Sequence, residues 1–288
     1  MTSMRSVVVT GVSTGIGWGA VQALTGAGFR VFGSVRKSED AERACQAFGN
    51  AFVPMMFDVT DEVAVHAAAD RVRAELAGQP LFGLVNNAGI AVPGPLAHLP
   101  IDQFRKQFDV NVTGLLITTQ AFAPLLGAAS GFSGQPGRIV NISSVAGKVV
   151  TPLAGAYGAS KFAVEAVSDA LRREFLIYGV DVILIEPGPV ATAIWGKNEQ
   201  VDFSIYDNTV YAGAISKMLV YLESVTASAI PLEKVGQLVL SVLTTPSPKV
   251  RYVITPSLLQ HYVTRYLPAR IVDRIFGKVL GLLPASRG

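Results

Sequence analysis

The segment from Arg5 to Gly26 constrains the fold of this 288-residue chain more than any other. A β-branched run from Ser6 to Thr10 predicts a buried strand, and an apolar helical stretch extends from about residue 16 to Gly26. Between them lies the turn Thr10-Gly11-Val12-Ser13-Thr14-Gly15-Ile16-Gly17. Its glycines allow backbone N–H groups to approach a phosphate at the start of the helix, where the helix dipole favours negative charge. Strand, glycine turn and helix together predict a dinucleotide-binding unit, with a tight turn that holds no ligand as the alternative.

Similar strand and helix patterns alternate along the rest of the chain. We predict strands near residues 5–10, 30–35, 51–57, 81–86, 137–142, 180–186 and 250–254. Helical stretches are predicted near 16–26, 38–48, 61–76, 101–127, 154–178 and 231–244. This alternation is typical of an α/β fold of the Rossmann-like type, a doubly wound parallel sheet of about seven strands with helices on both faces. Residues 1–288 are therefore expected to form a single domain.

Composition excludes several classes of function. The formal net charge is +3, with no cluster of Lys and Arg, so we expect no nucleic-acid partner. Cys45 is the only cysteine, which excludes an internal disulfide. The three histidines, His66, His98 and His261, are scattered, and no metal-ligand pattern is present, so we expect no metal.

The apolar segments do not predict a membrane protein. The run within Met1 to Thr10 is too short for a signal peptide, and we expect a cytoplasmic protein. An uncharged stretch between Asp109 and Arg138 is long enough to cross a membrane, but Asn111, Gln120 and Pro124 indicate a buried helix and loop instead.

Tyr157 and Lys161 form a candidate acid–base pair. They stand four residues apart in a predicted helix, which places both side chains on one face. A neighbouring ammonium favours the phenolate, and lowering a tyrosine pKa from ~10 to ~7 requires about 4 kcal/mol. We therefore expect Lys161 to lower the pKa of Tyr157. The alternative is a solvated pair, because this spacing is common on exposed helices.

The segment Gly11-Val12-Ser13-Thr14-Gly15 also matches the G-x-S-x-G pattern of serine hydrolases. That pattern normally follows several strands, whereas Ser13 follows the first, and no histidine lies in a suggestive setting. A hydrolase is a remote alternative.

Four further motifs follow in order. Asn87-Ala88-Gly89 ends the predicted strand 81–86, and Asn111 lies early in the predicted helix 101–127. Ser143 and Ser144 end the strand 137–142, with Ser144 thirteen residues before Tyr157, and Pro187-Gly188 closes the strand 180–186. With the glycine turn and the Tyr–Lys pair, these motifs make residues 5 to 192 resemble the short-chain dehydrogenase/reductase family, in its form of about 250 residues.

The resemblance implies an enzyme with the catalytic set Asn111, Ser144, Tyr157 and Lys161. Tyr157 would exchange a proton with the substrate oxygen while hydride moves to or from a nicotinamide. Lys161 would hold the nicotinamide ribose, Ser144 would donate a hydrogen bond to the developing alkoxide, and Asn111 would hold a water in a proton relay. Ser143 is the rival of Ser144, and Asn111 has the alternative role of a helix-bending polar residue.

The same resemblance implies a cofactor site, and the end of the second strand indicates which cofactor. An NAD enzyme requires an acidic residue there, whereas Val35 is followed by Arg36 and Lys37, which favours the 2′-phosphate of NADP(H). A solvated basic pair is the alternative. Asp58 matches an adenine contact, or else caps the helix after it, a role that Thr60 or Asp61 could equally fill. The implied cofactor-binding residues are Gly11, Ser13, Thr14, Gly15, Ile16, Gly17, Arg36, Lys37, Asp58, Val59, Asn87, Ala88, Gly89, Val110, Tyr157, Lys161, Pro187, Gly188, Val190 and Thr192.

Residues 190–230 are expected to form a substrate lid, as this region does in the family. They are rich in large apolar side chains, namely Ile194, Trp195, Phe203, Ile205, Tyr206, Val210 and Tyr211. Such a lining suits a bulky hydrophobic secondary alcohol, or its ketone or aldehyde, of steroid, retinoid or long-chain type. The lid and the C-terminal tail resemble those of the steroid and retinol dehydrogenases, a less specific resemblance than that of the catalytic motifs. A small helical subdomain with its own core is the alternative. We predict an NADP(H)-dependent oxidoreductase, with a catalytically silent NADP-sensing protein as the alternative.

Two features predict further contacts. The helices near 109–127 and 154–178 carry apolar residues on more than one face, which favours a homodimer or homotetramer. Residues 256–288 form an amphipathic extension that Pro268 should break into two helices. Its polar face carries Arg265, Arg270, Arg274 and Lys278. Two interpretations stay open, namely peripheral contact with an anionic membrane, or closure of the substrate cleft or of a subunit interface.

Overall fold

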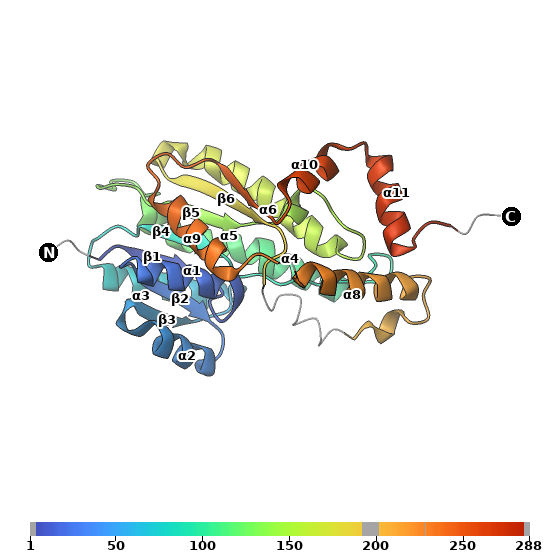
Figure 1. The fold of residues 1–288 in the computed structure, drawn as a ribbon. Coiled ribbons are helices and arrows are strands. Elements are labelled where there is room, and N and C mark those ends of the chain that lie inside the picture. Colours follow the sequence, from blue (N-terminus) through green and yellow to red (C-terminus); the bar gives the residue numbers. More distant parts are fainter. Residues whose placement is uncertain (1–3, 192–201, 228, 285–288) are drawn as a thin grey trace.

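The protein is described by a computed structural model at residues 4–191, 202–227 and 229–284. Seven parallel strands form one sheet in the order β3-β2-β1-β4-β5-β6-β7 (Figure 1). The strands are β1 Ser6–Val9, β2 Arg30–Val35, β3 Phe52–Met56, β4 Gly83–Asn86, β5 Arg138–Ile142, β6 Asp181–Pro187 and β7 Arg251–Ile254. The order reverses beside β1, so the predicted doubly wound, Rossmann-like sheet is confirmed.

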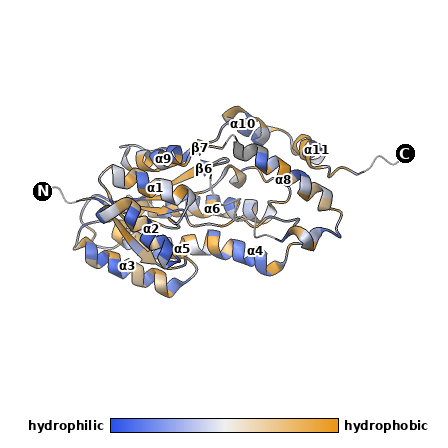
Figure 2. Ribbon diagram, turned by 60° about the horizontal axis from the view of Figure 1, so that its bottom comes forward, coloured by the Kyte–Doolittle hydropathy of each residue, from blue (hydrophilic) through white to orange (hydrophobic). Residues whose placement is uncertain are grey.

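Helices cover both faces of the sheet (Figures 1 and 2). The α-helices are α1 Gly15–Gly26, α2 Ser38–Phe48, α3 Glu62–Leu76, α4 Ile101–Phe108, α5 Gly114–Leu126, α6 Gly155–Glu174, α8 Ala212–Ala227, α9 Leu232–Thr244, α10 Leu258–Tyr266 and α11 Ala269–Leu280. Short 3₁₀ turns lie at Gly49–Ala51, Val145–Gly147, Phe175–Tyr178 and Phe203–Tyr206. Helices α1 and α9 pack on one face, and α3, α5 and α6 pack on the other.

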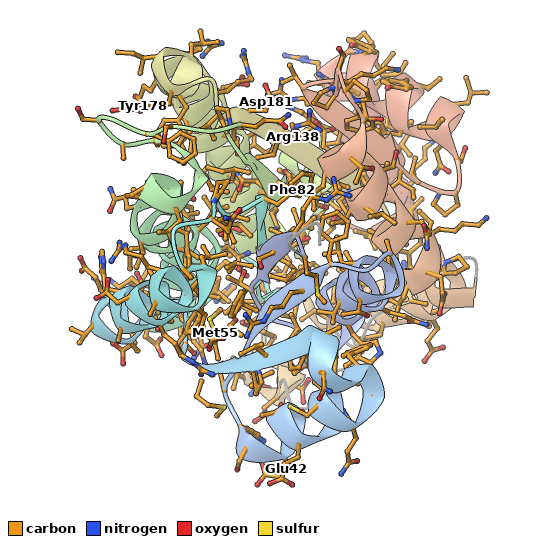
Figure 3. All side chains as sticks on the ribbon, turned by 90° about the vertical axis from the view of Figure 1, so that its left-hand side faces the viewer. Glu42, Met55, Phe82, Arg138, Tyr178 and Asp181 are labelled. Carbon is orange, nitrogen blue, oxygen red and sulfur yellow. The ribbon has the colours of Figure 1, made fainter. Side chains whose placement is uncertain are left out.

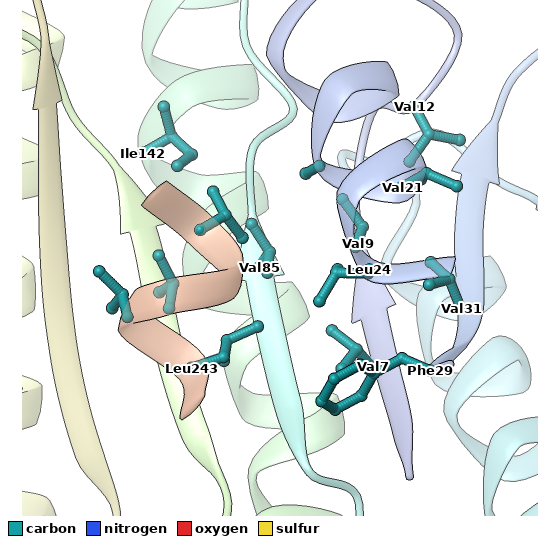
Figure 4. Close-up of a cluster of buried hydrophobic side chains, with 14 of the residues drawn as sticks. Val7, Val9, Val12, Val21, Leu24, Phe29, Val31, Val85, Ile142 and Leu243 are labelled. Carbon is teal, nitrogen blue, oxygen red and sulfur yellow. The ribbon is translucent and has the colours of Figure 1, made fainter. Parts of the chain in front are cut away.

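Strand alternation divides the core into two apolar layers. Val7 and Val9 point to the face covered by α1 and α9, whereas Val8 points to the opposite face. Figure 4 shows the first layer, where Leu24 of α1 and Leu243 of α9 lie over Val85. The side chains on both faces of the central strands are fully buried, which explains why those strands read as continuous apolar runs.

Helices α1 and α9 cross at two glycines. A side chain at Gly236 would collide with the backbone of Gly19, and one at Gly19 would meet the carbonyl of Leu232. The two backbones therefore approach each other without intervening side chains. The helix that follows the glycine turn is held from behind by a segment more than two hundred residues later in the sequence.

Arg138 ties the start of β5 to the end of α9. Its guanidinium donates to the carbonyls of Leu243 (2.9 Å), near the end of α9, and of Thr245 (2.6 Å), the residue just after it. The guanidinium also pairs with the carboxylate of Asp181 in β6 (3.4 Å). Figure 3 labels Arg138 and Asp181 on this side of the molecule. A cation at a helix C-terminus satisfies carbonyls that have no partner within the helix.

Two predicted helices are interrupted. The stretch 101–127 consists of α4, a π-helical turn at Asp109–Thr113 and α5. The stretch 154–178 ends as an α-helix at Glu174 and continues as the 3₁₀ turn to Tyr178. The π turn widens the helix at Asn111, and π turns of this kind often mark functional positions.

Three helices lie beyond the carboxyl ends of the strands. In Figure 1, α8, α10 and α11 gather at the end of the molecule opposite the N-terminus. Pro268 stands just before α11, so the chain turns there, as predicted. Within the described residues no helix is both long and apolar enough to cross a bilayer.

Candidate active site

The turn between β1 and α1 requires glycine at several positions. Gly11 and Gly15 have φ values of +69° and +64°, which side-chain-bearing residues rarely adopt. A side chain at Gly11 would press on the backbone of Ala88, and one at Gly17 would collide with the carbonyl of Gly11. Tight packing therefore brings the turn against the loop after β4.

Asn87 and Thr10 hold these two loops together. The Asn87 amide nitrogen donates to the carbonyls of Thr10 (2.8 Å) and Gly11 (3.0 Å). The Thr10 hydroxyl accepts from the backbone N–H of Asn87 (2.9 Å) and of Ala88 (3.0 Å). The Asn87 side chain is thus used inside the protein, whereas Ser13 and Thr14 remain accessible at the rim of the turn.

Arg36 and Lys37 lie exposed at the end of β2, as their sequence position required. Arg36 pairs with Asp58 at 3.3 Å. Burial favours the neutral form of Asp58, but hydrogen bonds from the Thr60 backbone and hydroxyl, together with Arg36, outweigh burial and hold its pKa below the usual value. The N-cap of α3 is Asp61 and not Asp58, because the Asp61 carboxylate accepts from Ala64 (3.0 Å).

Ser144, Tyr157 and Lys161 converge where β5 and β6 end. The hydroxyls of Ser144 and Tyr157 are hydrogen-bonded. The Lys161 ammonium donates to the carbonyl of Ile142 (2.8 Å) and lies 5.8 Å from the centre of the Tyr157 ring. All three side chains are buried, in contrast to the solvated-pair alternative. The Ser143 hydroxyl accepts or donates no hydrogen bond within the described residues.

The electrostatics of the pair differ from the expectation. Burial raises the pKa of Tyr157, and its hydrogen bond with Ser144 offsets this only in part. The Lys161 ammonium, which donates to the Ile142 carbonyl, does not reverse this rise in the Tyr157 pKa. Burial lowers the pKa of Lys161 to about 8, while the charge of Glu165 acts in the opposite direction. A phenol with a raised pKa is protonated at neutral pH, so it is poised to donate a proton.

A buried charge cluster lies behind Lys161. Glu165 accepts from Lys148 (2.7 Å) and from Arg251 of β7 (2.9 Å), and Arg251 also pairs with Asp169 (2.8 Å). Burial, and then the nearby charge of Glu165, raise the pKa of Glu186. Lys161 therefore has a carboxylate one helical turn behind it, anchored to the last strand of the sheet.

Asn111 lies in the π turn with its side chain buried. Its amide oxygen accepts from the N–H of Ile90 (2.9 Å), and its amide nitrogen donates to the Ile90 carbonyl (3.0 Å) and to the Ser160 hydroxyl (3.1 Å). The side chain is thus committed to protein partners. Only the backbone of Asn111 is left for the water of the proposed relay.

The other predicted cofactor residues lie around the same end of the sheet. Gly89 adjoins Asn111, Val59 packs on Gly114, and Pro187 accepts weakly from Ser144 (3.4 Å). Gly188 and Val190 follow β6, with Val190 bridged to Ile230, and Val110 is half-buried in the π turn. Ile16 is half-buried at the first turn of α1. Thr192 lies outside the described residues.

The lid region is only partly described. Ile194 and Trp195 lie outside the described residues, while Val210 and Ile205 are exposed. Tyr206 is buried in an apolar cluster with Leu153, Ile215, Met218 and Leu280. Leu153 belongs to the loop between Ser144 and Tyr157, so this cluster joins the candidate site to α8 and α11.

Three residues of the site were not found from the sequence. Gln107 is fully buried beside Asn111. Arg43 of α2 donates to the carbonyl of Ser13 (2.5 Å), which places a second guanidinium beside the glycine turn. Leu153 has a φ of +66°, a strained value for a branched residue. The i, i+4 spacing of Gln107 and Asn111 was the one available signal, and it indicates only a shared helix face.

Neither the hydrolase nor a metal site gains support. Ser13 contacts Arg43 through its carbonyl, whereas His66 lies on α3, His98 precedes α4 and His261 lies on α10. Among the described residues no group of His, Cys, Asp or Glu side chains is arranged to hold a metal ion.

Comparison with known proteins identifies the family. Residues 5–202 match the family model for short chain dehydrogenases. Because that match covers more than half of the chain and includes the glycine turn and the Tyr157–Lys161 pair, the protein belongs to the short-chain dehydrogenase/reductase family of oxidoreductases.

Individual relatives agree with this assignment. The chain is 41% identical over 278 residues to an NADPH-dependent 3-dehydrocapnine reductase of Ornithobacterium rhinotracheale, covering 96% of this chain and 98% of that protein. It is 32% identical to human retinol dehydrogenase 5, covering 95% and 88% of the two chains. A short-chain dehydrogenase of Streptomyces avermitilis shares the fold, with a TM-score of 0.76, 24% identity and coverage of 99% and 100%.

Proposed function

We propose that this protein is an NADP(H)-dependent reductase that converts the ketone or aldehyde of a bulky hydrophobic compound into its alcohol. The observation that carries the proposal is the buried cluster of Ser144, Tyr157 and Lys161 at the carboxyl ends of β5 and β6, at the same edge of the sheet as the glycine turn after β1. Ligands of open parallel sheets bind at this edge, next to the point where the strand order reverses.

The proposed mechanism assigns one task to each side chain. The bound nicotinamide would supply the hydride. Tyr157, held protonated by burial, donates its phenolic proton to the carbonyl oxygen of the substrate. Ser144, already hydrogen-bonded to Tyr157, donates to the same oxygen as negative charge develops on it. The charged form of Lys161 would stabilise the phenolate that Tyr157 becomes. Tyr157 would then regain a proton through a water held at the backbone of Asn111.

The chain's own residues fit NADP(H). Gly11, Gly15 and Gly17 leave the backbone of the turn open to a pyrophosphate at the start of α1. Arg36 at the end of β2 and Arg43 above the turn provide two guanidinium groups for a 2′-phosphate. Val35 stands where an NAD enzyme has an acidic residue. The relative from Ornithobacterium is also described as NADPH-dependent.

The substrate class rests on the apolar cluster beyond the site. Tyr206, Ile215, Met218 and Leu280 place aliphatic and aromatic groups next to the catalytic loop through Leu153. These side chains are buried against one another, and we propose that an apolar layer next to the catalytic loop favours a large apolar substrate over a small polar one. Retinol, in the name of the human relative, is of this type.

Turnover with a panel of ketones and aldehydes tests the proposal. The full chain is mixed with NADPH, and its absorbance at 340 nm is followed with long-chain, steroid and retinoid carbonyl compounds and with small polar ketones. Faster oxidation of NADPH with the bulky compounds is expected. Binding of NADPH without turnover of any compound would indicate the silent NADP-sensing protein, and absence of NADPH binding would contradict the proposal altogether.

Self-association is proposed through α5 and α6. Leu115, Phe122 and Val164 are buried within the fold, but Phe162 of α6 stays 44% exposed beside Lys161. An uncovered aromatic side chain on the catalytic helix favours a two-fold partner. Analytical ultracentrifugation of the wild type should show a dimer or tetramer, and the Phe162→Glu variant should sediment as a smaller assembly. Val63→Glu on α3, at an apolar residue that is 80% exposed, is the control. A monomeric wild type contradicts the proposal.

Peripheral contact with an anionic membrane is proposed for α10 and α11. The inner side of α11 packs on α8 through Leu280, whereas Ile271, Ile275 and Val279 form a stripe that is 45–54% exposed. Arg270, Arg274 and Lys278 lie on the same helix, a combination that suits an anionic lipid surface. Figure 2 shows this helix at the end of the molecule.

Sedimentation of the protein with lipid vesicles tests this contact. The protein should sediment with vesicles that contain phosphatidylserine and less with pure phosphatidylcholine. The double variant Ile275→Asp/Val279→Asp should lose binding while it retains turnover of a small soluble ketone. If the wild type binds neither type of vesicle and the double variant has a different oligomeric state, α11 is a subunit interface instead.

A further inference from the structure

Gln107 occupies the centre of a buried hydrogen-bond network beside the candidate site. Its side chain, at the end of α4, is completely inaccessible to solvent. Its amide oxygen accepts from the N–H of Val92 (2.7 Å), and its amide nitrogen donates to the carbonyl of Ile90 (2.8 Å). A buried amide that satisfies both its oxygen and its nitrogen fixes the backbone that it contacts.

Gln107 and Asn111 share the same partners. Both amide nitrogens donate to the Ile90 carbonyl, and both approach the Ser160 hydroxyl, at 3.4 Å from Gln107 and 3.1 Å from Asn111. The Ser160 hydroxyl donates to the backbone carbonyl of Tyr157 (2.7 Å). Two side chains from the interrupted helix therefore connect the loop after β4 with the first turn of α6.

That connection joins the two parts of the proposed reaction. Ile90 and Val92 follow Asn87, which is bonded to the glycine turn where the cofactor would lie. Tyr157, on the other side of Ser160, carries the proton that is transferred. We infer that Gln107 is a positioning residue, which sets the distance between Tyr157 and the loop that borders the cofactor site. This inference rests on the proposed function and adds to it a residue that does not touch substrate.

Removal of the amide should affect turnover more than cofactor binding. Gln107→Leu keeps the approximate size of the side chain and removes its hydrogen bonds to Ile90, Val92 and Ser160. Because a displacement of about 1 Å at reacting groups can reduce rates about 10²-fold, kcat should fall about 10- to 100-fold, while the Kd for NADPH stays within about threefold. Gln103→Leu is the matched control, since it makes the same change one turn earlier, where the amide nitrogen donates to the exposed Asp102 side chain (3.3 Å). Its kcat should stay unchanged.

Coupling to Ser160 distinguishes positioning from a general loss of stability. If Gln107 acts through Ser160 and Tyr157, the variant Gln107→Leu/Ser160→Ala should lose clearly less activity than the product of the two single losses. A multiplicative loss, or an unchanged kcat in Gln107→Leu, would overturn the inference. Lack of turnover in the wild type overturns the proposed function instead, so the two failures are distinguishable.

Gln107→Glu keeps the test decisive if Gln107→Leu does not fold. The protonated carboxyl can still donate to Ile90 and accept from Val92, whereas the carboxylate cannot donate. The kcat of Gln107→Glu relative to wild type should therefore rise at least fivefold as the pH falls from about 8 to about 5.5, a range in which a buried carboxyl takes up its proton. A ratio that does not change with pH overturns the inference.

Discussion

The half of the molecule that would bind cofactor differs from the half that would bind substrate in where its apolar side chains lie. Around β1 and α1, Val8 and Leu24 are fully buried, and the turn between them is so tight that Gly11 and Gly17 cannot carry a side chain. In α10, Leu259 is 77% exposed and Tyr266 is 72% exposed, and in α11 Val279 is 54% exposed. The first half is therefore determined by internal packing, whereas the second leaves large apolar side chains exposed on its surface.

The two halves meet at Tyr157, and the largest expected effect tests that position. Tyr157→Phe should lower kcat about 10²- to 10⁴-fold, because phenylalanine keeps the ring and lacks the transferable proton. The Kd for NADPH, measured by its fluorescence, should change little, because the cofactor half is intact. Tyr178→Phe, on the surface beyond α6, is the control and should match the wild type. A variant that kept more than about a tenth of the wild-type kcat would exclude Tyr157 as the proton donor.

Stability should divide along the same boundary. Leu24→Ala leaves a cavity between α1 and the sheet and should reduce the free energy of unfolding by about 2–5 kcal/mol. Ile275→Ala removes a side chain that is 47% exposed and should change it by no more than about 0.5 kcal/mol. Urea denaturation followed by circular dichroism measures both. Equal losses would show that α11 is packed as tightly as the core and would remove the contrast between the halves.

Cofactor choice should depend on the cofactor half alone. Arg36→Asp should raise the KM for NADPH more than tenfold, because a lost charged hydrogen bond costs about 1.5–3 kcal/mol and the new carboxylate, like Asp58 beside it, repels a phosphate. The KM for NADH should change less, so that the preference of the enzyme for NADPH over NADH becomes smaller. Arg105→Asp, exposed on α4, is the control. An unchanged ratio of NADPH to NADH efficiency would place the 2′-phosphate elsewhere, with Arg43 as the next candidate.

A smaller effect is expected from pH. The pKa of Lys161 is lowered from 10.5 to about 8, so its charge is lost as the pH rises through 8. Tyr157 does not titrate there, because its pKa is raised above 10.0. The kcat/KM for ketone reduction should therefore fall up to about tenfold between pH 7 and 9.5. A flat profile would show that the charge of Lys161 is not required.

Unfolding does not explain that fall. An unfolded lysine keeps its proton up to about its ordinary pKa of 10.5, whereas the folded one releases it near 8. The unfolded state therefore binds more protons between these values, and this residue makes the protein more stable as the pH rises through that window. Thermal denaturation at pH 7.5 and 9.5 separates the two effects.

The sheet could be predicted from the sequence, and much of the site's interior could not. Parallel strands buried on both faces produce β-branched runs such as Ser6 to Val9, which are visible without a structure. The π turn at Asp109–Thr113 leaves no such pattern, because its residues are weak helix formers and helix propensity does not distinguish a π turn from an α-helix. Pro268 marked the end of α10 because proline lacks the N–H that a helix interior requires.

Electrostatic predictions were the least successful. The spacing of Tyr157 and Lys161 correctly placed them on one helix, but the direction of the Tyr157 pKa shift was wrong. The spacing of residues in the sequence identifies neighbours along one helix. The burial that raises the Tyr157 pKa, and the Ile142 carbonyl that binds the Lys161 ammonium, depend on parts of the fold outside that helix. Gln107 was missed for the same reason, since its partners at Ile90 and Val92 lie in a loop that the sequence alone does not place beside it.

The crossing of α1 and α9 also determines the order in which the protein can assemble during synthesis. The glycine turn leaves the ribosome well before α9, yet Gly19 packs on the backbone of Gly236, and Arg138 donates to the end of α9 about a hundred residues after it in the sequence. Until α9 emerges, an apolar groove over β1 and β4 stays open. The nascent chain thus cannot complete the packing around β1 and α1 before α9 has been made, and binding by chaperones that hold apolar segments is most useful in that interval.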